Sequence, residues 1–253
     1  MGVWRSWDYY AEGWIRSAKP CEVQWGLTDD INRDRLPCYQ RISYTIHAML
    51  KFYELSPSPN NTKVRMALRY KDIEFEAISV DAADRSTMIE VSGQELTPVI
   101  EDRGVVINDS EAILQYLDAN YRESPRLYPE YKSARKECDA WKSRLDEMVV
   151  TYWLPVFLTG IGMQDSFEPG SRQGFEDGLR RLNEELGDGV SFKGPEMPIC
   201  DLRVAEWATY AFPSPELIER VPLFARFKQL FGLEEGSLPH LERFLEPWNQ
   251  RLA

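Results

Sequence analysis

Ser58 lies in a short polar turn whose composition could support chemistry on an anion or a thiolate. The segment 56–61 reads Ser-Pro-Ser-Pro-Asn-Asn and separates an apolar run from a helical pattern. Backbone N–H groups at a helix start favour negative charge at that point. Where Cys-Pro-x-Cys occupies such a turn, the helix terminus lowers the thiol pKa. This turn contains no cysteine, so dithiol redox chemistry is excluded here.

A strand–helix–strand unit must position this turn. Residues 50–55 form the first strand, which the prolines end because they cannot donate ladder hydrogen bonds. Asn61 or Thr62 is expected to cap the helix. Four residues then recur at helical spacing: Val64, Ala67, Leu68 and Lys71. Residues 73–80 return to β-branched and aromatic types, which predicts a parallel second strand.

The next segments predict a short helix and a hairpin. Residues 84–91 are expected to be helical. Thr97-Pro98 stands directly before Val99-Ile100, where a strand tolerates proline and where the peptide bond can be cis. Asp102-Arg103-Gly104 predicts a tight turn between two antiparallel strands.

A further helix closes this half of the chain. Asn108 is expected to be its N-cap, with Glu111 completing a box-like pattern. The helix ends near Tyr121, and the proline-marked segment 121–129 is the linker. Residues 50–121 therefore read β-α-β-α-β-β-α.

From Glu130 onward the sequence reads as helices. A long amphipathic helix is predicted to end near Pro155. Its apolar stripe consists of Ala134, Cys138, Trp141, Leu145, Met148 and Tyr152. Further helices are predicted over 175–186, 201–211 and 239–252.

Composition and charge narrow the class of protein. The chain has 253 residues, enough for two modest domains with real cores. Acidic residues outnumber basic ones, 41 against 30, and the net charge of −11 argues against nucleic acid or an anionic membrane as main partner. No run approaches the roughly 18 apolar residues of a membrane span, and no signal-peptide pattern is present. We therefore predict a soluble, cytoplasmic protein.

Cysteine and histidine are too sparse for a metal site. The four cysteines are widely spaced without a Cys-x-x-Cys pair, and His47 and His240 are the only histidines. Zinc sites need clustered ligands of these types. The sequence predicts no metal.

Residues 1–48 form an aromatic-rich N-terminal extension. They carry Trp4, Trp7, Trp14 and Trp25, half of all eight tryptophans, without a lasting period. Either this segment docks through its tryptophans on the rest of the chain or a partner, or it is an upstream extension of little consequence before Met49.

The segments after the extension together resemble the glutathione transferase family, over residues 49–253. Phe52-Tyr53 followed by Ser58-Pro59 is similar to the family's first strand and catalytic turn. Thr97-Pro98-Val99-Ile100 resembles the family's segment with a cis-proline, and Asp109-Ser110 resembles its Glu-Ser pair. All three motifs occur in the family's order.

The resemblance implies a fold and an activity. The fold is α/β plus all-α, with a thioredoxin-like βαβαββα domain, 49–123, followed by a helical-bundle domain, 130–253. The activity is that of a glutathione S-transferase, a transferase of alkyl or aryl groups used in detoxification. Glutathione is then the co-substrate, and a small-molecule electrophile is the other substrate.

The motifs also imply roles for individual residues. Ser58 takes the catalytic place and donates a hydrogen bond to the glutathione thiolate. Thr97, before Pro98, pairs through its backbone with the tripeptide. Asp109 and Ser110 hold the γ-glutamyl end, because a carboxylate suits a helix N-terminus and an ammonium group suits a carboxylate.

Three residues depart from the family pattern, and other functions remain open. Leu96 stands where many members have a polar residue, Thr97 replaces the usual valine, and Glu111 stands where a basic residue is frequent. The competing function is a non-catalytic binding or scaffold protein of the same fold. A third is a transferase specialised for isomerisation, dehalogenation or peroxide reduction.

The helical domain carries three further expectations. Trp141 and Tyr152 are candidates for the substrate pocket, with core packing as the alternative. Asp201 resembles the acidic residue of the family's helix-capping box. A homodimer is expected through the helix after Ser110 and the long helix from Glu130, because that helix has a wide apolar stripe.

Overall fold

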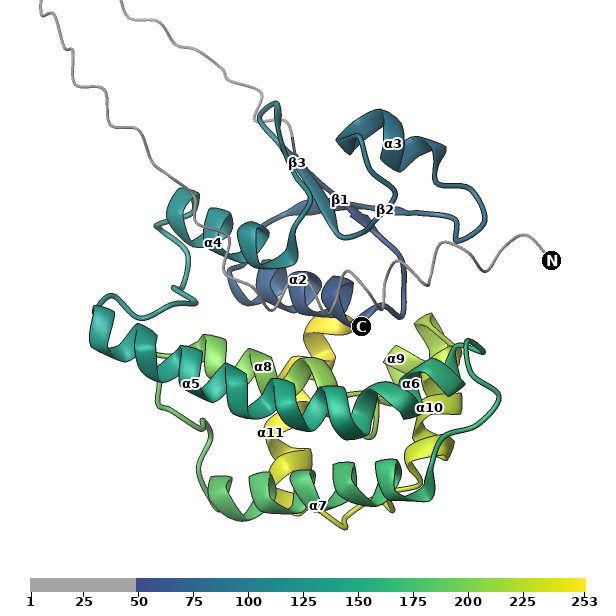
Figure 1. Ribbon diagram of the computed structural model, residues 1–253. Coiled ribbons are helices and arrows are strands. Elements are labelled where there is room, and N and C mark those ends of the chain that lie inside the picture. Colours follow the sequence, from purple (N-terminus) through teal and green to yellow (C-terminus); the bar gives the residue numbers. More distant parts are fainter. Residues whose placement is uncertain (1–48) are drawn as a thin grey trace, which may run out of the picture. The chain divides into compact units, whose positions relative to one another are not determined.

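A computed structural model describes residues 49–253, which hold a four-stranded sheet followed by helices (Figure 1). The described elements are β1 (Leu50–Glu54), α2 (Pro59–Tyr70), β2 (Phe75–Ser79), α3 (Ser86–Ser92), β3 (Val99–Asp102), β4 (Val105–Ile107), α4 (Ser110–Asn120), α5 (Lys132–Met148), the π-helical turn η1 (Val149–Trp153), α6 (Leu154–Gly160), α7 (Pro169–Leu186), α8 (Pro198–Ala208), α9 (Pro215–Arg220), α10 (Leu223–Phe231) and α11 (Pro239–Leu252). The predicted extension, residues 1–48, lies outside the described residues, and so does its expected docking through tryptophans.

The sheet is mixed, with strand order β2-β1-β3-β4. β1 pairs in parallel with β2, with Leu50 opposite Phe75, as the strand–helix–strand pattern predicts. β3 is antiparallel to both β1 and β4. The predicted α/β plus all-α architecture is therefore confirmed: a thioredoxin-like N-terminal domain precedes a helical region. The limits 49–123 and 130–253 of the two domains stay predictions.

α2 lies between the sheet and the helical region (Figure 1), and this position explains its burial. It contacts α4, α8 and α11, and every residue from Asn61 to Leu68 is buried. A charged side chain in such a helix needs a partner. Arg65 donates from Nε to Oε2 of Glu54 at 3.0 Å and from Nη2 to the other carboxylate oxygen. This bidentate pair ties α2 to the end of β1.

A buried lysine holds the connection between α4 and α5. The Nζ of Lys71 is fully buried and donates to Oδ1 of Asp118 at 3.0 Å and to the carbonyl of Pro125 at 2.8 Å. Asp118 also accepts from the backbone N–H groups of Leu127 and Tyr128. The end of α2 thus orders the chain segment that leads into the helical region.

α2 begins at Pro59, so the predicted cap at Asn61 or Thr62 is wrong. Ser58 is the N-cap residue, with extended backbone at φ −62° and ψ 131°, and Pro59 opens the helix. Proline suits the first position because its φ is already helical and its missing N–H would have no intrahelical partner. The side chains of Asn60 and Asn61 are therefore not needed for capping, and they hydrogen-bond to other segments of the chain.

The long helix does not end near Pro155 as predicted. α5 runs into η1, and α6 continues to Gly160 with Pro155 in its first turn. The wider π-helical turn lets the chain stay helical without the hydrogen bond that proline cannot donate.

The π-helical turn also changes which face of the long helix is buried. Leu145 is buried as predicted, but Val149 and Trp153 then continue the core in place of Met148 and Tyr152, which are half-buried. A π-helical turn inserts an extra residue, so the buried face rotates past it. A strict 3.6-residue period could not anticipate this shift.

Met148 and Tyr152 pack on α7. A Cβ placed on Gly174 would lie 2.3 Å from Cδ1 of Tyr152, and one on Gly178 would lie 2.2 Å from Sδ of Met148. The absence of side chains at both glycines therefore lets the helices approach closely. Since α7 and α8 cover the apolar stripe, the reason for the predicted dimer through α4 and α5 is removed, and the homodimer stays a prediction.

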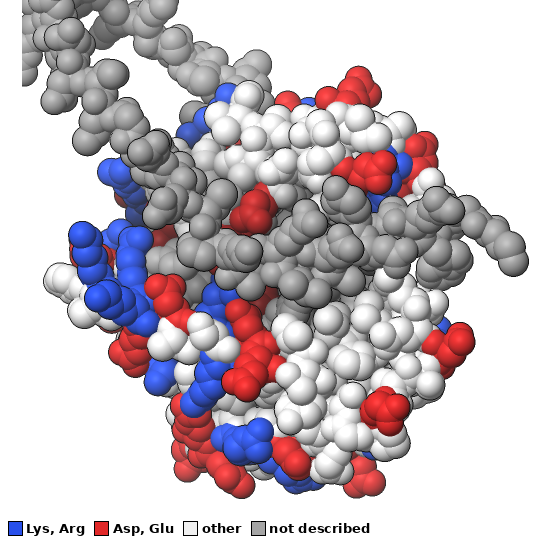
Figure 2. Space-filling model, in the orientation of Figure 1, with Lys and Arg blue, Asp and Glu red and all other residues white. Residues whose placement is uncertain are grey.

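The outer face of α5 is charged rather than apolar. Lys142 pairs with Asp146 along the helix, and Arg144 pairs with Glu185 of α7 at 2.7 Å. Figure 2 shows basic and acidic side chains interspersed on the side of the molecule where α5 begins. This helix therefore presents mixed charge to its surroundings.

The remaining helices match the predictions unevenly. α11 has the predicted bounds, whereas α7 and α8 begin at Pro169 and Pro198, earlier than predicted. α9 and α10 are short and were not predicted. Every residue of α8 is buried, so its pattern lacks the polar face that marks an amphipathic helix. Among residues 49–253, no helix is long and apolar enough to cross a bilayer.

Asp201 of α8 holds the preceding loop. Its Oδ1 accepts from the backbone N–H of Phe192 at 2.8 Å. Burial raises the pKa of this carboxyl to about 6, although the hydrogen bond from Phe192 acts in the opposite direction. The ionised form is therefore less favourable in the folded protein than in the unfolded chain.

The raised pKa of Asp201 predicts a pH-dependent stability. As pH rises from about 4 to 6, the unfolded chain ionises first, so this group lowers the free energy of unfolding until the folded pKa is passed. The full loss is about 2–3 kcal/mol. Asp201→Asn keeps an oxygen acceptor for Phe192, so the variant is expected to lack this part of the pH dependence. Urea unfolding of both proteins from pH 4.5 to 7 measures it, and a constant difference across that range would contradict the prediction.

Candidate functional site

The turn between β1 and α2 presents a buried hydroxyl. Ser58 is 2 % exposed, and its Oγ makes no hydrogen bond with any described residue. Its backbone is held, because its N–H donates to the carbonyl of Leu55 at 3.0 Å and its carbonyl accepts from the N–H of Thr62 at 2.9 Å. A buried hydroxyl without a partner costs free energy, so this position suits a polar ligand atom.

Asn61 joins this turn to the strand segment at Pro98. Its Nδ2 donates to the carbonyl of Leu55 at 3.3 Å and to Oγ1 of Thr97 at 3.0 Å. The Thr97-Pro98 peptide bond is cis, as expected. The hydrogen bond to Thr97 brings the two sequence motifs together at the start of α2.

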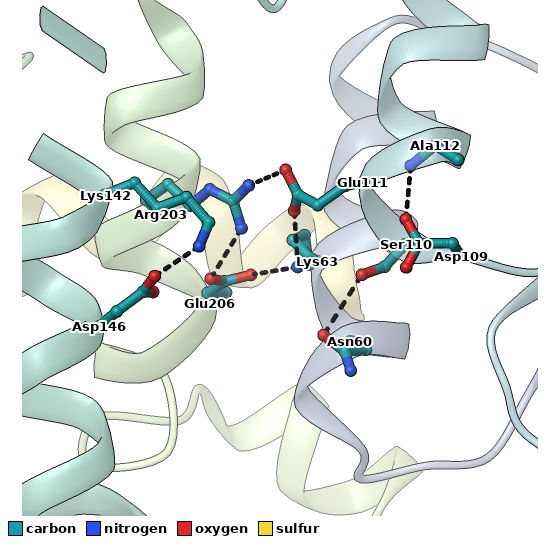
Figure 3. Close-up of polar contacts among 10 residues, drawn as sticks. All are labelled: Asn60, Lys63, Asp109, Ser110, Glu111, Ala112, Lys142, Asp146, Arg203 and Glu206. Atoms are coloured by element: carbon teal, nitrogen blue, oxygen red, sulfur yellow. Dashed lines mark hydrogen bonds and ion pairs between the residues drawn. The ribbon is translucent and has the colours of Figure 1, made fainter. Parts of the chain in front are cut away.

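Asp109 and Ser110 begin α4. Asp109 is the N-cap, and its Oδ1 accepts from the backbone N–H of Ala112 at 2.8 Å (Figure 3). The predicted cap at Asn108 is wrong by one residue. Asp109 is exposed, and only one of its carboxylate oxygens is used in the cap, so the other can accept from a ligand.

A side-chain contact brings the first turns of α2 and α4 together. The Oγ of Ser110 donates to Oδ1 of Asn60 at 3.3 Å (Figure 3). Each helix start carries N–H groups without intrahelical partners and a partial positive charge. Ser58 lies at one of these starts and Ser110 at the other. The arrangement can therefore bind an anionic molecule that reaches both.

A buried charge network lies behind Ser110 and joins the two regions of the protein. Lys63 of α2 pairs with Glu111 of α4 at 3.0 Å, and Arg203 of α8 also pairs with Glu111. Glu206 of α8 lies 3.4 Å from Arg203 and 3.8 Å from Lys63 (Figure 3). Two cations thus alternate with two carboxylates.

The network sets the charge states of its members. Burial alone would raise the pKa of the Glu111 carboxyl, but Lys63 and Arg203 outweigh burial and hold that pKa well below its ordinary value. For Glu206 burial prevails and raises the pKa, against the opposing effect of Lys63 and Arg203. Glu111 stands where glutathione transferases frequently have a basic residue. Its ion pairs with Lys63 of α2 and Arg203 of α8 place it at the junction between the sheet domain and the helical region.

Curated relatives match more than half of the chain. Glutathione S-transferase U19 of Arabidopsis thaliana is 25 % identical over 162 residues, which cover 63 % of this chain and 72 % of the relative. Glutathione S-transferase U8 of Arabidopsis thaliana is 28 % identical over 156 residues, which cover 60 % of this chain and 68 % of the relative.

A solved structure and a family model agree with these relatives. The structure of rice GST1 (OsGSTU1) in complex with glutathione superposes with a TM-score of 0.57 at 23 % identity, covering 80 % of this chain and 85 % of that one. The family model of the glutathione S-transferase N-terminal domain matches residues 52–125. The chain therefore resembles glutathione S-transferases in sequence and in fold. The resemblance expected from the three motifs is thereby confirmed.

The sequence analysis missed one residue that lies far along the chain from the turn at Ser58. Tyr210 follows α8, is fully buried, and its Oη donates to the carbonyl of Pro57 in the turn. No local pattern marks it, because the contact joins residues 153 positions apart. The only signal is an aromatic residue in an all-buried stretch.

A second residue that sequence reasoning missed is Arg85, which precedes α3. It is 7 % exposed, and none of its three guanidinium nitrogens has a hydrogen-bond partner among the described residues. A buried cation is costly without a counter-charge, so its hydrogen-bonding capacity is available to an anion. A single arginine in a polar loop carries no sequence signal.

The structure places the two predicted pocket residues in helix packing. The Nε1 of Trp141 donates to the carbonyl of Cys200 at 3.1 Å, and its ring packs on Phe192. Tyr152 packs on Gly174 of α7. Within this glutathione S-transferase fold both side chains therefore serve contacts between helices, and the core alternative fits them better than the pocket.

Proposed function

We propose that this protein is a glutathione transferase in which Ser58 donates a hydrogen bond to the glutathione thiolate. Glutathione would be the co-substrate, and the thiolate would attack a small electrophile. The hydroxyl and the N-terminus of α2 both favour the thiolate over the thiol, which makes the sulfur nucleophilic near pH 7. A cytoplasmic detoxification role belongs to the same proposal.

The observation that carries the proposal is the unpaired hydroxyl of Ser58. Ser58 is buried, its backbone is hydrogen-bonded on both sides, and it occupies the N-cap position of α2 without using its hydroxyl in the cap. A turn serine with no role would commonly donate to a nearby backbone carbonyl. A thiolate placed at this hydroxyl would satisfy it and would also meet the positive end of the helix.

The neighbouring residues would bind the rest of the tripeptide. The backbone of Thr97, before cis-Pro98, would pair with the peptide of glutathione. The N–H of Ser110 would receive the γ-glutamyl carboxylate, and the free oxygen of Asp109 would accept from the α-ammonium group. The link between the starts of α2 and α4 supports one ligand reaching both.

Titration with glutathione, followed by conjugation to an aryl halide, tests the proposal. Calorimetry is expected to detect saturable binding of glutathione, and the protein is expected to form the conjugate faster than the buffer. Failure to bind glutathione, together with isolation of a stable protein partner, would favour the non-catalytic scaffold of the same fold.

Asp109→Asn separates ligand binding from helix capping. The amide oxygen can still accept from the N–H of Ala112, so the stability of α4 is expected to change little. Loss of one charge-assisted hydrogen bond to the ammonium group is expected to raise the Kd of glutathione about 10-fold. Ser110→Ala is the matched control, and it should have a smaller effect because the backbone N–H survives. An unchanged Kd in Asp109→Asn would contradict the role given to this carboxylate.

A further inference from the structure

Tyr210 is held rigidly in the helical region. It is fully buried, with ring centroids of its neighbours at 4.9 to 5.7 Å. Those neighbours are Trp153, Phe157, Phe224 and Phe227. A ring enclosed in this way has little freedom to change rotamer. Its hydroxyl is therefore a fixed point.

The backbone around Tyr210 is also tied down by α11. The Oγ1 of Thr209 donates to Oδ1 of Asn249, and Nδ2 of Asn249 donates to the carbonyl of Phe212 at 2.8 Å. One amide side chain therefore clamps the segment on both sides of Tyr210. The clamp adds to the rigidity of the ring.

The hydroxyl of Tyr210 makes two hydrogen bonds, one as donor and one as acceptor. It donates to the carbonyl of Pro57, and it lies 3.3 Å from Oγ1 of Thr62. Because the single phenol proton is used on Pro57, Thr62 must be the donor in the second contact. Burial raises the pKa of the Tyr210 phenol, so the group stays a donor at neutral pH.

The hydrogen bond from Tyr210 helps to fix the peptide unit that precedes Ser58. The carbonyl of Pro57 and the N–H of Ser58 belong to one planar unit. Tyr210 holds the carbonyl, and the carbonyl of Leu55 accepts from the N–H at 3.0 Å. With both ends of the plane held, and one of them held by a residue of the helical region, the backbone position from which the Ser58 side chain projects is fixed in part from outside the sheet domain. The hydroxyl itself has no described partner that could orient it.

We propose that Tyr210 is a positioning residue for Ser58, through which the helical region aims the hydroxyl at the start of α2. The effect of this residue on glutathione rests on the proposed function. The geometric part does not, because it concerns only the position of the Ser58 side chain. Two experiments separate the two parts.

The first experiment uses the full chain with Ser58→Cys as a reporter and needs no glutathione. A thiol at this helix start is expected to have a pKa below its ordinary value of about 8.5. The rate of iodoacetamide alkylation at position 58 is followed against pH by mass spectrometry, which separates this thiol from the native cysteines. Adding Tyr210→Phe is expected to raise the thiol pKa by about 0.5–1 unit, which lowers alkylation at pH 6.5 about 3- to 10-fold.

Two further variants make the reporter experiment decisive. Tyr116→Phe removes another hydrogen-bonded phenol, whose Oη donates to Asp102 at 2.8 Å, and is expected to leave the alkylation profile unchanged. Thr62→Val removes only the donor to Tyr210 and is expected to shift the profile in the same direction by less. If Tyr210→Phe does not fold, Thr62→Val decides. No shift, or an equal shift in Tyr116→Phe, would overturn the proposal.

The second experiment measures the glutathione complex. Tyr210→Phe is expected to raise the pKa of the bound thiol and to lower kcat/KM at pH 6.5 about 5-fold, with less than about a twofold change in the Kd of glutathione. In a Ser58→Ala background the same substitution is expected to add nothing, because its effect passes through Ser58. Equal effects in both backgrounds would overturn the positioning role. If the unmodified protein does not bind glutathione, the proposed function fails, and the alkylation experiment still decides the geometry.

Discussion

Ser58→Ala is expected to lower the turnover of conjugation about 10- to 100-fold. A serine hydroxyl has too high a pKa to act as a base, so its contribution is one charge-assisted hydrogen bond to the thiolate, about 1.5–3 kcal/mol. The apparent pKa of bound glutathione should rise by a corresponding amount, while its Kd changes only modestly. Initial rates and the thiolate absorbance of the complex, both measured against pH, give these quantities.

Ser56→Ala is the matched control for Ser58→Ala. Ser56 lies in the same turn but is exposed, so its loss is expected to leave turnover nearly unchanged. Loss of activity in Ser56→Ala with full activity in Ser58→Ala would contradict the placement of the site. Ser58→Cys is a sharper probe, because an acidic thiol at the helix start should form a mixed disulfide with glutathione and convert conjugation into thiol transfer.

Arg203→Met is expected to lower the free energy of unfolding by about 3–5 kcal/mol. The substitution leaves Glu206, which is 1 % exposed, with only Lys63 at 3.8 Å as a counter-charge. It also removes one of the two cations that hold Glu111. Urea unfolding at pH 7.5 measures the loss. Since burial keeps the Glu206 pKa raised, the deficit is expected to shrink as pH falls and this carboxylate becomes protonated.

Two comparisons test the reason for that loss. Arg126 pairs with Glu130 at 3.6 Å with both side chains largely exposed, and Arg126→Met is expected to change stability by less than about 0.5 kcal/mol. Adding Glu206→Gln to Arg203→Met is expected to recover part of the loss, because it removes the stranded charge. No recovery would show that Arg203 acts through packing rather than through charge.

Local patterns in the sequence were sufficient for most of the fold. The strand beginning at Leu50 and the helix 239–252 were predicted well because each has an apolar face and clear boundaries. The thioredoxin-like order followed from turn residues between short strands. The errors lie where two local signals competed, as at Pro59 against Asn61, or where a helix has no polar face, as in α8.

The candidate site was predictable in part. Ser58 was singled out because a hydroxyl in a turn before a helix suits an anion or a thiolate, and the resemblance to the family implied the roles of Ser58, Thr97-Pro98 and Asp109-Ser110. The structure adds the contacts that join these segments, from Asn61 to Thr97 and from Ser110 to Asn60. Their roles with glutathione stay proposals.

The sequence by itself determined the order of elements in the sheet domain, the turn that holds Ser58 and the resemblance to the glutathione S-transferase family. Only the tertiary structure decided which side chains those elements meet: Tyr210 at the carbonyl of Pro57, and Arg203 at Glu111. Periodicity and capping arise from interactions within a few residues, so they can be read along the chain. A hydrogen bond between residues 92 or 153 positions apart depends on how whole helices pack, and no local pattern carries that information.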